Sequence, residues 1–225
     1  MSTEQQTKAS EVSVREPNAP WLKNYGDIPF HLEYFKGSMW GKVEQIIAQY
    51  PDYIAYDFMG KHTSYRKFGR DVELCARALK AIGVRPGDRI TICMPNCPQT
   101  VVVFYAVNVV GAIANMVHPL SSENEIEFFL RESGSICAIT LDQFYHKFEA
   151  IRQNVELSNV ILASIKDELS QPIKAGYMLT EGRKIQKIPK DAPVIRWAEF
   201  IRRGREYTWK YRVEKSGDNP AVILY

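Results

Sequence analysis

The sequence predicts an α/β fold in which a mostly parallel sheet carries helices on both faces. Three observations lead to this prediction. From about residue 89 onward, short apolar runs rich in β-branched residues alternate with stretches at helical spacing. Each predicted strand is apolar along its length, as expected where both faces of a sheet are covered. Glycines and helix-capping residues separate the runs and mark where the elements start and stop.

The length and composition are those of an ordinary globular protein. The chain has 225 residues, 45% of them hydrophobic and 24% charged, which is enough for a substantial core. The formal net charge of +3 is small against 29 basic and 26 acidic side chains, so it indicates neither a nucleic acid nor an anionic lipid as partner. The longest apolar run, 101–117, is shorter than the roughly 20 residues of a membrane span and predicts a buried helix followed by a strand.

Residues 1–20 are predicted to form a flexible tail, because they are polar and show no apolar periodicity. They lack the apolar segment of a secretory signal, so the cytoplasm is the default location, with peripheral membrane association of a longer parent enzyme left open. Residues 21–225 are predicted to form a partial α/β domain, truncated at its carboxyl end.

The first predicted elements lie between residues 38 and 60. Val43, Ile46 and Ile47 recur at helical spacing before Pro51, which predicts a helix that stops there. The alternation that follows predicts a strand over 53–58, and Gly60 predicts a turn after it.

The clearest amphipathic helix follows. Thr63 or Ser64 can cap it, and Gly83 ends it. A buried strand is predicted over 89–94, where the residues are apolar and β-branched. One face of the helix carries Leu74, Cys75, Ala78, Leu79 and Ile82.

The regular alternation then continues to residue 163. Ser122 and Glu125 form a capping-box pattern at the start of one helix, and Gly134 ends that helix. The predicted elements are a helix over 98–110, a strand over 112–117, a helix from 122 to 133, a strand over 135–140, a helix over 143–154 and a strand over 159–163.

Regular structure weakens between residues 166 and 193. This stretch is polar, lysine-rich and broken by prolines and glycines, so it predicts a meandering connection with at most a short helix. Trp197, Phe200 and Ile201 restore helical spacing, and Gly204 is predicted to stop that helix.

The last residues, DNPAVILY, predict a turn and then a buried strand over 221–225. An interior strand at a terminus has no helix to cover it, so we expect the sheet to continue in a longer protein. In open α/β sheets, ligands bind beyond the carboxyl ends of the strands. The expected continuation would therefore carry the ligand-binding loop.

The four cysteines, Cys75, Cys93, Cys97 and Cys137, lie in apolar stretches and are predicted to be buried free thiols. Cys93 and Cys97 form a C-x3-C pattern that leaves a metal or redox interpretation open, but there is no second pair at metal-site spacing. We predict no metal site.

Several motifs in order resemble the adenylate-forming enzymes. The stretch SYRKFGRDVELCARALKAIGVRPGDRITICMPNCPQTVVVFYAVNVVGAIANMVHPL resembles the opening of that superfamily, and PWLKNYGDIP narrows the resemblance to long-chain fatty acyl-CoA synthetases. DNPAVILY is similar to the strand that leads into the family's phosphate loop. The resemblance covers nearly all of residues 21–225, and its specificity rests on the order and spacing of these motifs.

The resemblance implies a two-step ligation. A fatty carboxylate attacks the α-phosphorus of ATP to give acyl-AMP and pyrophosphate, and coenzyme A then displaces AMP. ATP, Mg²⁺ and CoA are thus expected to serve the parent enzyme, and none is expected to bind the fragment. The family's phosphate loop, ribose-binding aspartate, hinge and carboxy-terminal lysine would all follow residue 225. We therefore expect no catalytic residue here and an inactive fragment. A homodimer remains open, as does the acyl chain length.

Candidate ligand-side residues follow from the predicted strand ends: Pro95, Asn96, His118, Pro119 and Thr140. His118 is the most reactive of them. The family often has Asn-Pro where this chain has His118-Pro119, near where pantetheine would approach. A structural role for the histidine is the competing interpretation, because general-base work needs a positioned partner. Asn96 is expected to cap the helix that follows.

A basic cluster lies near the end of the chain, with Trp209 and Tyr211 between its members, and it has two possible interpretations. One is a site that binds single-stranded nucleic acid. A solvated charged face is the preferred one, because glutamates at 199, 206 and 214 interrupt the cluster, which consists of Arg202, Arg203, Arg205, Lys210, Arg212 and Lys215.

Two hypotheses for function thus stand. In the first, the chain is part of an AMP-forming fatty acid:CoA ligase. The second is a self-contained α/β module that binds a small ligand or a protein partner, with its terminal strand at the edge of the sheet.

Overall fold

The computed structural model describes residues 19–29, 32–214 and 217–225. The chain divides into two compact units, Met1–Phe35 and Lys36–Tyr225. In the first unit, the described residues include a short 3-10 helix, η1 (Leu22–Asn24). Apart from its last two residues, the predicted tail over 1–20 lies outside the described residues.

The second unit is built on a six-stranded sheet in which every pair of neighbours is parallel, as predicted. Apolar strands buried on both faces are typical of such sheets. The spatial order is β7 (Ile195–Arg196), β6 (Asn159–Ala163), β5 (Cys137–Leu141), β3 (Arg89–Cys93), β4 (Ile113–Met116) and β8 (Val222–Leu224). The predicted strands at 89–94, 112–117, 135–140 and 159–163 are confirmed to within two residues at each end.

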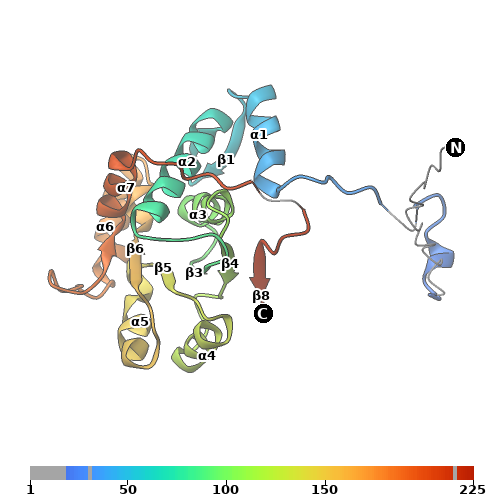
Figure 1. Ribbon diagram of the computed structural model, residues 1–225. Coiled ribbons are helices and arrows are strands. Elements are labelled where there is room, and N and C mark those ends of the chain that lie inside the picture. The colour runs from blue at the N-terminus through green and yellow to red at the C-terminus, as the bar shows by residue number, and fades with distance from the viewer. Residues whose placement is uncertain (1–18, 30–31, 215–216) are drawn as a thin grey trace, which may run out of the picture. The chain divides into compact units, whose positions relative to one another are not determined.

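Helices cover both faces of this sheet (Figure 1). One face carries α2 (Tyr65–Ala81), α3 (Pro98–Val109) and α7 (Trp197–Glu206), with α1 (Met39–Gln49) packed against α2 and α3. The other face carries α4 (Glu123–Ser133) and α5 (Tyr145–Ile151). A further helix, α6 (Gln171–Leu179), lies in the connection between β6 and β7, where the sequence predicted at most a short helix.

The predicted helix over 143–154 is divided into three parts. A 3-10 turn, η2 (Asp142–Phe144), precedes α5, and a second 3-10 turn, η3 (Arg152–Asn154), follows it. Two further 3-10 turns, η4 (Ile165–Asp167) and η5 (Glu181–Arg183), flank α6.

The predicted helix starts are largely confirmed. Ser64 caps α2 by accepting a hydrogen bond from the Lys67 backbone N–H. At the start of α4, Ser122 and Glu125 form the predicted capping box, each side chain accepting from the other's backbone N–H. Gly134 ends α4 with φ 59°, a left-handed conformation that glycine adopts without a steric penalty.

A two-stranded hairpin stands apart from the main sheet. Its strands, β1 (Ile54–Phe58) and β2 (Lys61–Ser64), pair antiparallel. The sequence predicted β1 and the turn but missed β2, because the short run KHTS lacks strong strand character. Met59 (φ 51°) and Gly60 (φ 77°) are both left-handed, as a tight two-residue hairpin turn requires.

The hydrophobic core divides between the two faces of the sheet. The larger cluster joins α2, α3 and α7 to the sheet through side chains such as Val72, Leu79 and Phe200, which are all fully buried. The smaller cluster joins α4 and α5 to the opposite face through Ile126, Leu130 and others. Residues 101–117 divide into α3, a turn and β4, and no helix in the described part of the chain is long and apolar enough to cross a membrane.

One sequence prediction needs correction. Gly204 does not stop its helix, because α7 continues to Glu206 and uses the glycine as a contact with α2. The predicted strand at the end of the chain is present as β8, which pairs with β4, and Leu224 and Tyr225 are 71% and 55% exposed. The expectation that this strand is interior refers to a sheet that continues in a longer protein, so it stays a prediction.

Candidate functional site

The topology places one crevice at the carboxyl edge of the sheet. The connection that leaves β3 leads to α3 on one face, whereas the connections that leave its two neighbours, β4 and β5, lead to α4 and α5 on the other face. Where adjacent connections diverge in this way, the loops separate and a ligand crevice opens between them.

A pocket of about 640 Å³ lies at this divergence. It is open to solvent and has the size of small-molecule sites. Four of the five residues predicted from strand ends line it: Pro95, Asn96, His118 and Pro119. The rest of the lining consists of Met94, Met116, Val117, Leu120, Gln143, Phe144, Leu224 and Tyr225.

Thr140 does not belong to this pocket. Its side chain is fully buried, and its hydroxyl donates to the Cys93 carbonyl oxygen at 2.8 Å. The hydroxyl therefore joins two neighbouring strand ends instead of facing a ligand.

Asn96 is exposed at the pocket but does not cap α3, contrary to the prediction. Cys97 occupies the N-cap position, without a side-chain cap hydrogen bond. Thr100 organises this turn instead, because its hydroxyl donates to the Pro95 carbonyl oxygen at 2.6 Å and lies 3.2 Å from the Cys97 sulfur. The Asn96 side chain is thus not committed to the helix start.

His118 is exposed, and its ring is held by its own loop. The imidazole Nδ1 accepts a hydrogen bond from the Leu120 backbone N–H at 3.3 Å, and the Ser121 backbone N–H donates to the His118 carbonyl oxygen at 3.0 Å. In the neutral ring, an accepting Nδ1 leaves the proton on Nε2. This geometry makes the neutral ring a hydrogen-bond donor at the pocket.

Lys147 of α5 also holds this loop. Its ammonium group donates to the carbonyl oxygens of Pro119, at 3.0 Å, and Ser121, at 2.6 Å. It also lies 5.9 Å from the centre of the Phe144 ring, within cation–π range. The sequence reasoning missed Lys147, because a single lysine in a predicted helix gives no sign of its partners.

A polar network joins β3, β4 and the carboxyl end of α4. Asn115 of β4 is fully buried, and its amide nitrogen donates to Thr91 at 2.8 Å and to Ser133 at 3.0 Å. Arg89 adds a bond from Nε to the Ser133 carbonyl oxygen at 2.8 Å. These contacts attach the carboxyl end of α4 to the sheet and so fix the helix that follows the His118 loop.

The four cysteines are buried and free, as predicted. Burial raises the pKa of the Cys93 thiol to about 12 and also raises the pKa values of Cys75, Cys97 and Cys137. Such thiols stay protonated at neutral pH and behave as small apolar side chains. Within the described residues, no three His, Cys, Asp or Glu side chains come together as metal ligands would.

Glutamates pair with much of the basic cluster. Arg202 bonds to Glu199 at 2.8 Å and to Glu206 at 2.5 Å, and Arg203 bonds to Glu199 at 2.9 Å. These hydrogen bonds hold the pKa of Glu199 at about 2. Arg212 pairs with Glu44 of α1. The pairs agree with the preferred interpretation of a solvated, charge-balanced face.

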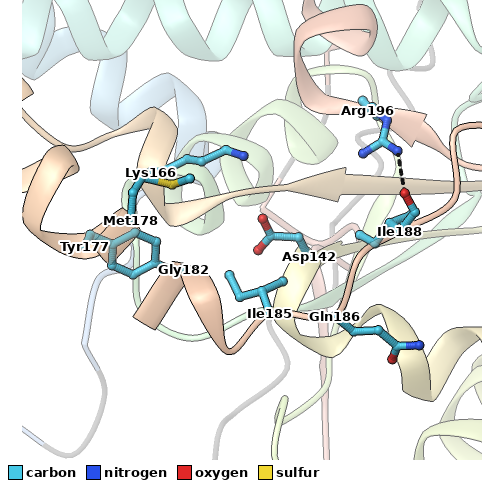
Figure 2. Close-up of a pocket in the computed structure, with 9 residues that line it drawn as sticks. All are labelled: Asp142, Lys166, Tyr177, Met178, Gly182, Ile185, Gln186, Ile188 and Arg196. Atoms are coloured by element: carbon cyan, nitrogen blue, oxygen red, sulfur yellow. Dashed lines mark hydrogen bonds between the residues drawn. The ribbon is translucent and has the colours of Figure 1, made fainter. Parts of the chain in front are cut away.

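A second, smaller cavity of about 160 Å³ lies beside α6 (Figure 2). Asp142 and Lys166 enter it from the carboxyl ends of β5 and β6, and Tyr177 and Met178 enter it from α6. Arg196 donates to the Ile188 carbonyl oxygen at 3.4 Å on its far side. The cavity thus lies where the connection containing α6 folds against the sheet.

Comparison with known proteins identifies the family. The family model described as "AMP-binding enzyme" matches residues 43–225. The chain belongs to this AMP-binding enzyme family. It is 32% identical over 167 residues to a long-chain-fatty-acid–CoA ligase of Bacillus subtilis (strain 168), a match that covers 74% of this chain and 30% of that protein.

A second relative extends the match, and solved structures agree in fold. A long-chain-fatty-acid–CoA ligase of Haemophilus influenzae is 28% identical over 210 residues, covering 91% of this chain and 37% of that protein. A long-chain-fatty-acid–CoA ligase from Archaeoglobus fulgidus superposes with a TM-score of 0.64 at 16% identity, over 85% of this chain and 35% of that one. Coronafacic acid ligase from Pectobacterium brasiliense superposes with a TM-score of 0.65 at 19% identity, over 82% of this chain and 33% of that one. This AMP-binding family chain thus spans about a third of the length of its relatives.

Proposed function

We propose that this chain forms one wall of the ligand crevice in an AMP-forming fatty acid:CoA ligase, which converts a fatty acid, ATP and CoA into acyl-CoA, AMP and pyrophosphate. The observation that carries the proposal is the 640 Å³ pocket at the carboxyl edge of β3, β4 and β5, in a chain of the AMP-binding family. The named relatives that are long-chain-fatty-acid–CoA ligases favour a fatty acid as the substrate class.

The pocket suits a ligand that is part apolar and part polar. Methionine, valine and aromatic side chains make up much of its lining. His118 Nε2 can donate a hydrogen bond to an anionic oxygen, and the Asn96 amide can donate or accept. We assign these two residues to ligand orientation and not to bond breaking. The Asn96 amide is not basic, and among the described residues no carboxylate pairs with His118 to activate it as a base.

The proposal places no metal on this chain. The described residues do not gather a set of side chains that would hold Mg²⁺, so no step is assigned to it here. ATP and CoA would meet this chain at the crevice, and residues outside the chain would supply the phosphate-binding groups.

The first test uses the 225-residue chain itself. Isothermal titration with ATP and Mg²⁺ should show no binding at micromolar concentration, and incubation with a fatty acid, ATP and CoA should yield no acyl-CoA. Turnover by this chain would contradict the assignment of the catalytic groups to residues outside it.

The second test uses the gene. A reading frame that continues past Tyr225 into a Ser/Thr/Gly-rich run ending in Lys-Gly would support the ligase, and the longer protein should then form acyl-CoA from a fatty acid. In that protein, His118→Ala should raise the KM for a substrate more than it lowers kcat, because orienting contacts act mainly on binding. A stop codon after Tyr225, or a longer protein without this activity, would contradict the proposal.

The second hypothesis, a self-contained module for a small ligand or protein partner, rests on the pocket alone. In that case, the pocket should bind a small molecule in the 225-residue chain alone. A fragment screen followed by NMR at His118 would detect such binding.

A further inference from the structure

A further cavity shares no lining residue with the crevice or with the cavity beside α6. Its volume is about 140 Å³, and side chains from β1, α2, α3 and α7 line it together with Glu168, which follows η4. This volume exceeds the roughly 30 Å³ that one water molecule takes in the liquid and lies below the roughly 300–1,000 Å³ of drug-sized sites. The cavity, which we name the Gln99 cavity, therefore suits a ligand of a few non-hydrogen atoms.

Gln99 gives this cavity a buried hydrogen-bond acceptor that has no donor. The residue lies in the first turn of α3 and is 1% exposed. Its Nε2 donates to the Ser164 carbonyl oxygen at 3.0 Å, which fixes the amide and leaves Oε1 as its remaining polar atom. Oε1 is buried and accepts no hydrogen bond from the described part of the chain. A buried acceptor without a donor costs free energy, so a ligand that donates to Oε1 gains affinity.

The ionised groups around the cavity leave one positive charge unpaired. Lys67 pairs with Asp71 at 2.5 Å within α2. Glu168 pairs with Lys61 of β2 at 3.5 Å. Arg205 of α7 also lines the cavity, but it is exposed and forms no ion pair with any described residue. A ligand with a single negative charge near Arg205 therefore balances the site.

The rest of the lining is mainly apolar. It consists of aliphatic and aromatic side chains: Leu74, Val102, Ile201, Trp197 and Tyr56. Burial is the main cause that raises the pKa of Tyr56 to about 12, so this phenol stays protonated at neutral pH and adds no charge. Such a lining favours a short hydrocarbon chain over a strongly hydrated ion such as inorganic phosphate, which would lose its water without gaining enough partners.

We propose that the Gln99 cavity binds a short hydroxycarboxylic acid, with its hydroxyl donating to Gln99 Oε1, its methylene groups against the apolar side chains and its carboxylate facing Arg205. A hydroxyl satisfies the buried acceptor without bringing a further charge into the protein. An ammonium group would also donate, but it would add positive charge to a site whose unpaired group is already positive. The proposal does not depend on the proposed function, because the crevice is a separate site.

The experiment is an NMR titration of the 225-residue chain at low ionic strength. The probes are three acids with a terminal hydroxyl: 3-hydroxypropionate, 4-hydroxybutyrate and 5-hydroxypentanoate. At least one should bind with a Kd of about 1 mM, as expected for so few atoms. The side-chain amide signals of Gln99 and the indole signal of Trp197 should shift on binding, and the ring signals of His118 in the crevice should not.

Two analogues of the tightest-binding acid test its two polar contacts on the unmodified chain. The acid without the hydroxyl should bind about tenfold more weakly, because Oε1 then has no donor. The diol in which a second hydroxyl replaces the carboxylate should bind about fivefold more weakly, since its partner Arg205 is exposed and screened by solvent.

Variants assign each contact to its residue. Gln99→Met should bind the acid with and without the hydroxyl equally, and Arg205→Gln should bind the acid and the diol equally. Arg70→Gln removes an exposed arginine of α2 outside the cavity and should leave all affinities unchanged. Gln99→Met also loses the hydrogen bond to Ser164, so circular dichroism and thermal unfolding should show that it remains folded. The analogue series tests the proposal even where this variant does not fold.

Three results would overturn the proposal. The first is that none of the three acids shifts the Gln99 and Trp197 signals at tens of millimolar. The second is equal affinity for the acids with and without the hydroxyl, which would show that water alone satisfies Oε1. The third is tighter binding of 4-aminobutyrate than of 4-hydroxybutyrate, which would show a site for an ammonium group. Selective binding of a hydroxy acid that both cavity variants alter and Arg70→Gln does not supports the proposal.

Discussion

At the scale of single residues, glycine positions show how local signals and packing can disagree. Gly134 and Gly204 both follow helical stretches, and the sequence predicted both as helix ends. Gly134 has φ 59° and ends α4, whereas Gly204 lies inside α7. A Cβ on Gly204 would lie 2.5 Å from the Leu74 carbonyl oxygen and 2.9 Å from the Ala78 backbone nitrogen. The glycine is therefore used for close approach between α2 and α7.

We predict that Gly204→Ala destabilises the protein by about 1–3 kcal/mol, because the added methyl group has no space against the α2 backbone. Gly176→Ala in α6 is the matched control. A Cβ there would have no neighbour within 4 Å, and alanine should stabilise the helix by up to about 1 kcal/mol. Urea unfolding of both variants measures the difference. Equal effects would contradict the close contact between α2 and α7.

At the scale of elements, the loop between β4 and α4 carries the candidate site residue His118, and its conformation is stabilised by contacts with α5. His118 lies in this loop, and Lys147 of α5 donates to two of its carbonyl oxygens, those of Pro119 and Ser121. The capping box at Ser122 then starts α4. The loop is thus fixed by one contact across elements and one local motif.

We predict that Lys147→Met frees this loop and lowers the free energy of unfolding by about 1–2 kcal/mol, because hydrogen bonds from a charged donor are lost. The ¹⁵N signals of the His118 ring should shift toward a mixture of tautomers, since the Nδ1 contact with Leu120 depends on the loop geometry.

Lys147→Arg should restore part of the effect, and Lys67→Met, which removes an exposed ion pair with Asp71, should leave the His118 signals unchanged. A His118 spectrum that is the same in Lys147→Met and the wild type would show that Lys147 does not position the loop.

At the scale of the whole molecule, the strands of the sheet differ in how many neighbouring strands they pair with. β3 pairs with both β4 and β5 and is covered on both faces, whereas β8 pairs with β4 alone. Thr91 and Ile92 of β3 are fully buried, whereas Ile223 is half-buried and Leu224 is exposed. The free energy of local opening should therefore be lowest at β8.

We predict that hydrogen exchange is fastest at the amides of β8 and slowest at those of β3, with a difference of several orders of magnitude in protection. Exchange followed by NMR or mass spectrometry measures it on the 225-residue chain. Equal protection of β8 and β3 would mean that another copy of the chain covers the edge in solution.

The distribution of charge is also a property of the whole molecule. A net charge of +3 over 225 residues indicates no partner, yet it arises from +4 in residues 171–190 and −1 elsewhere. Total charge therefore conceals a local excess, and the exposure of Leu179 beside it becomes evident only from the folded helix.

The sequence by itself determined the α/β class, most helix and strand positions, the burial of the cysteines and four of the residues that line the crevice. Periodicity, capping residues and glycines are local signals, and the carboxyl ends of parallel strands necessarily meet at one edge. Only the tertiary structure decided that Gly204 packs against α2, that Thr140 turns inward, that Lys147 holds the His118 loop and that β8 pairs with β4. Each of these depends on which elements become neighbours, and contacts between residues distant in sequence leave no periodic pattern along the chain.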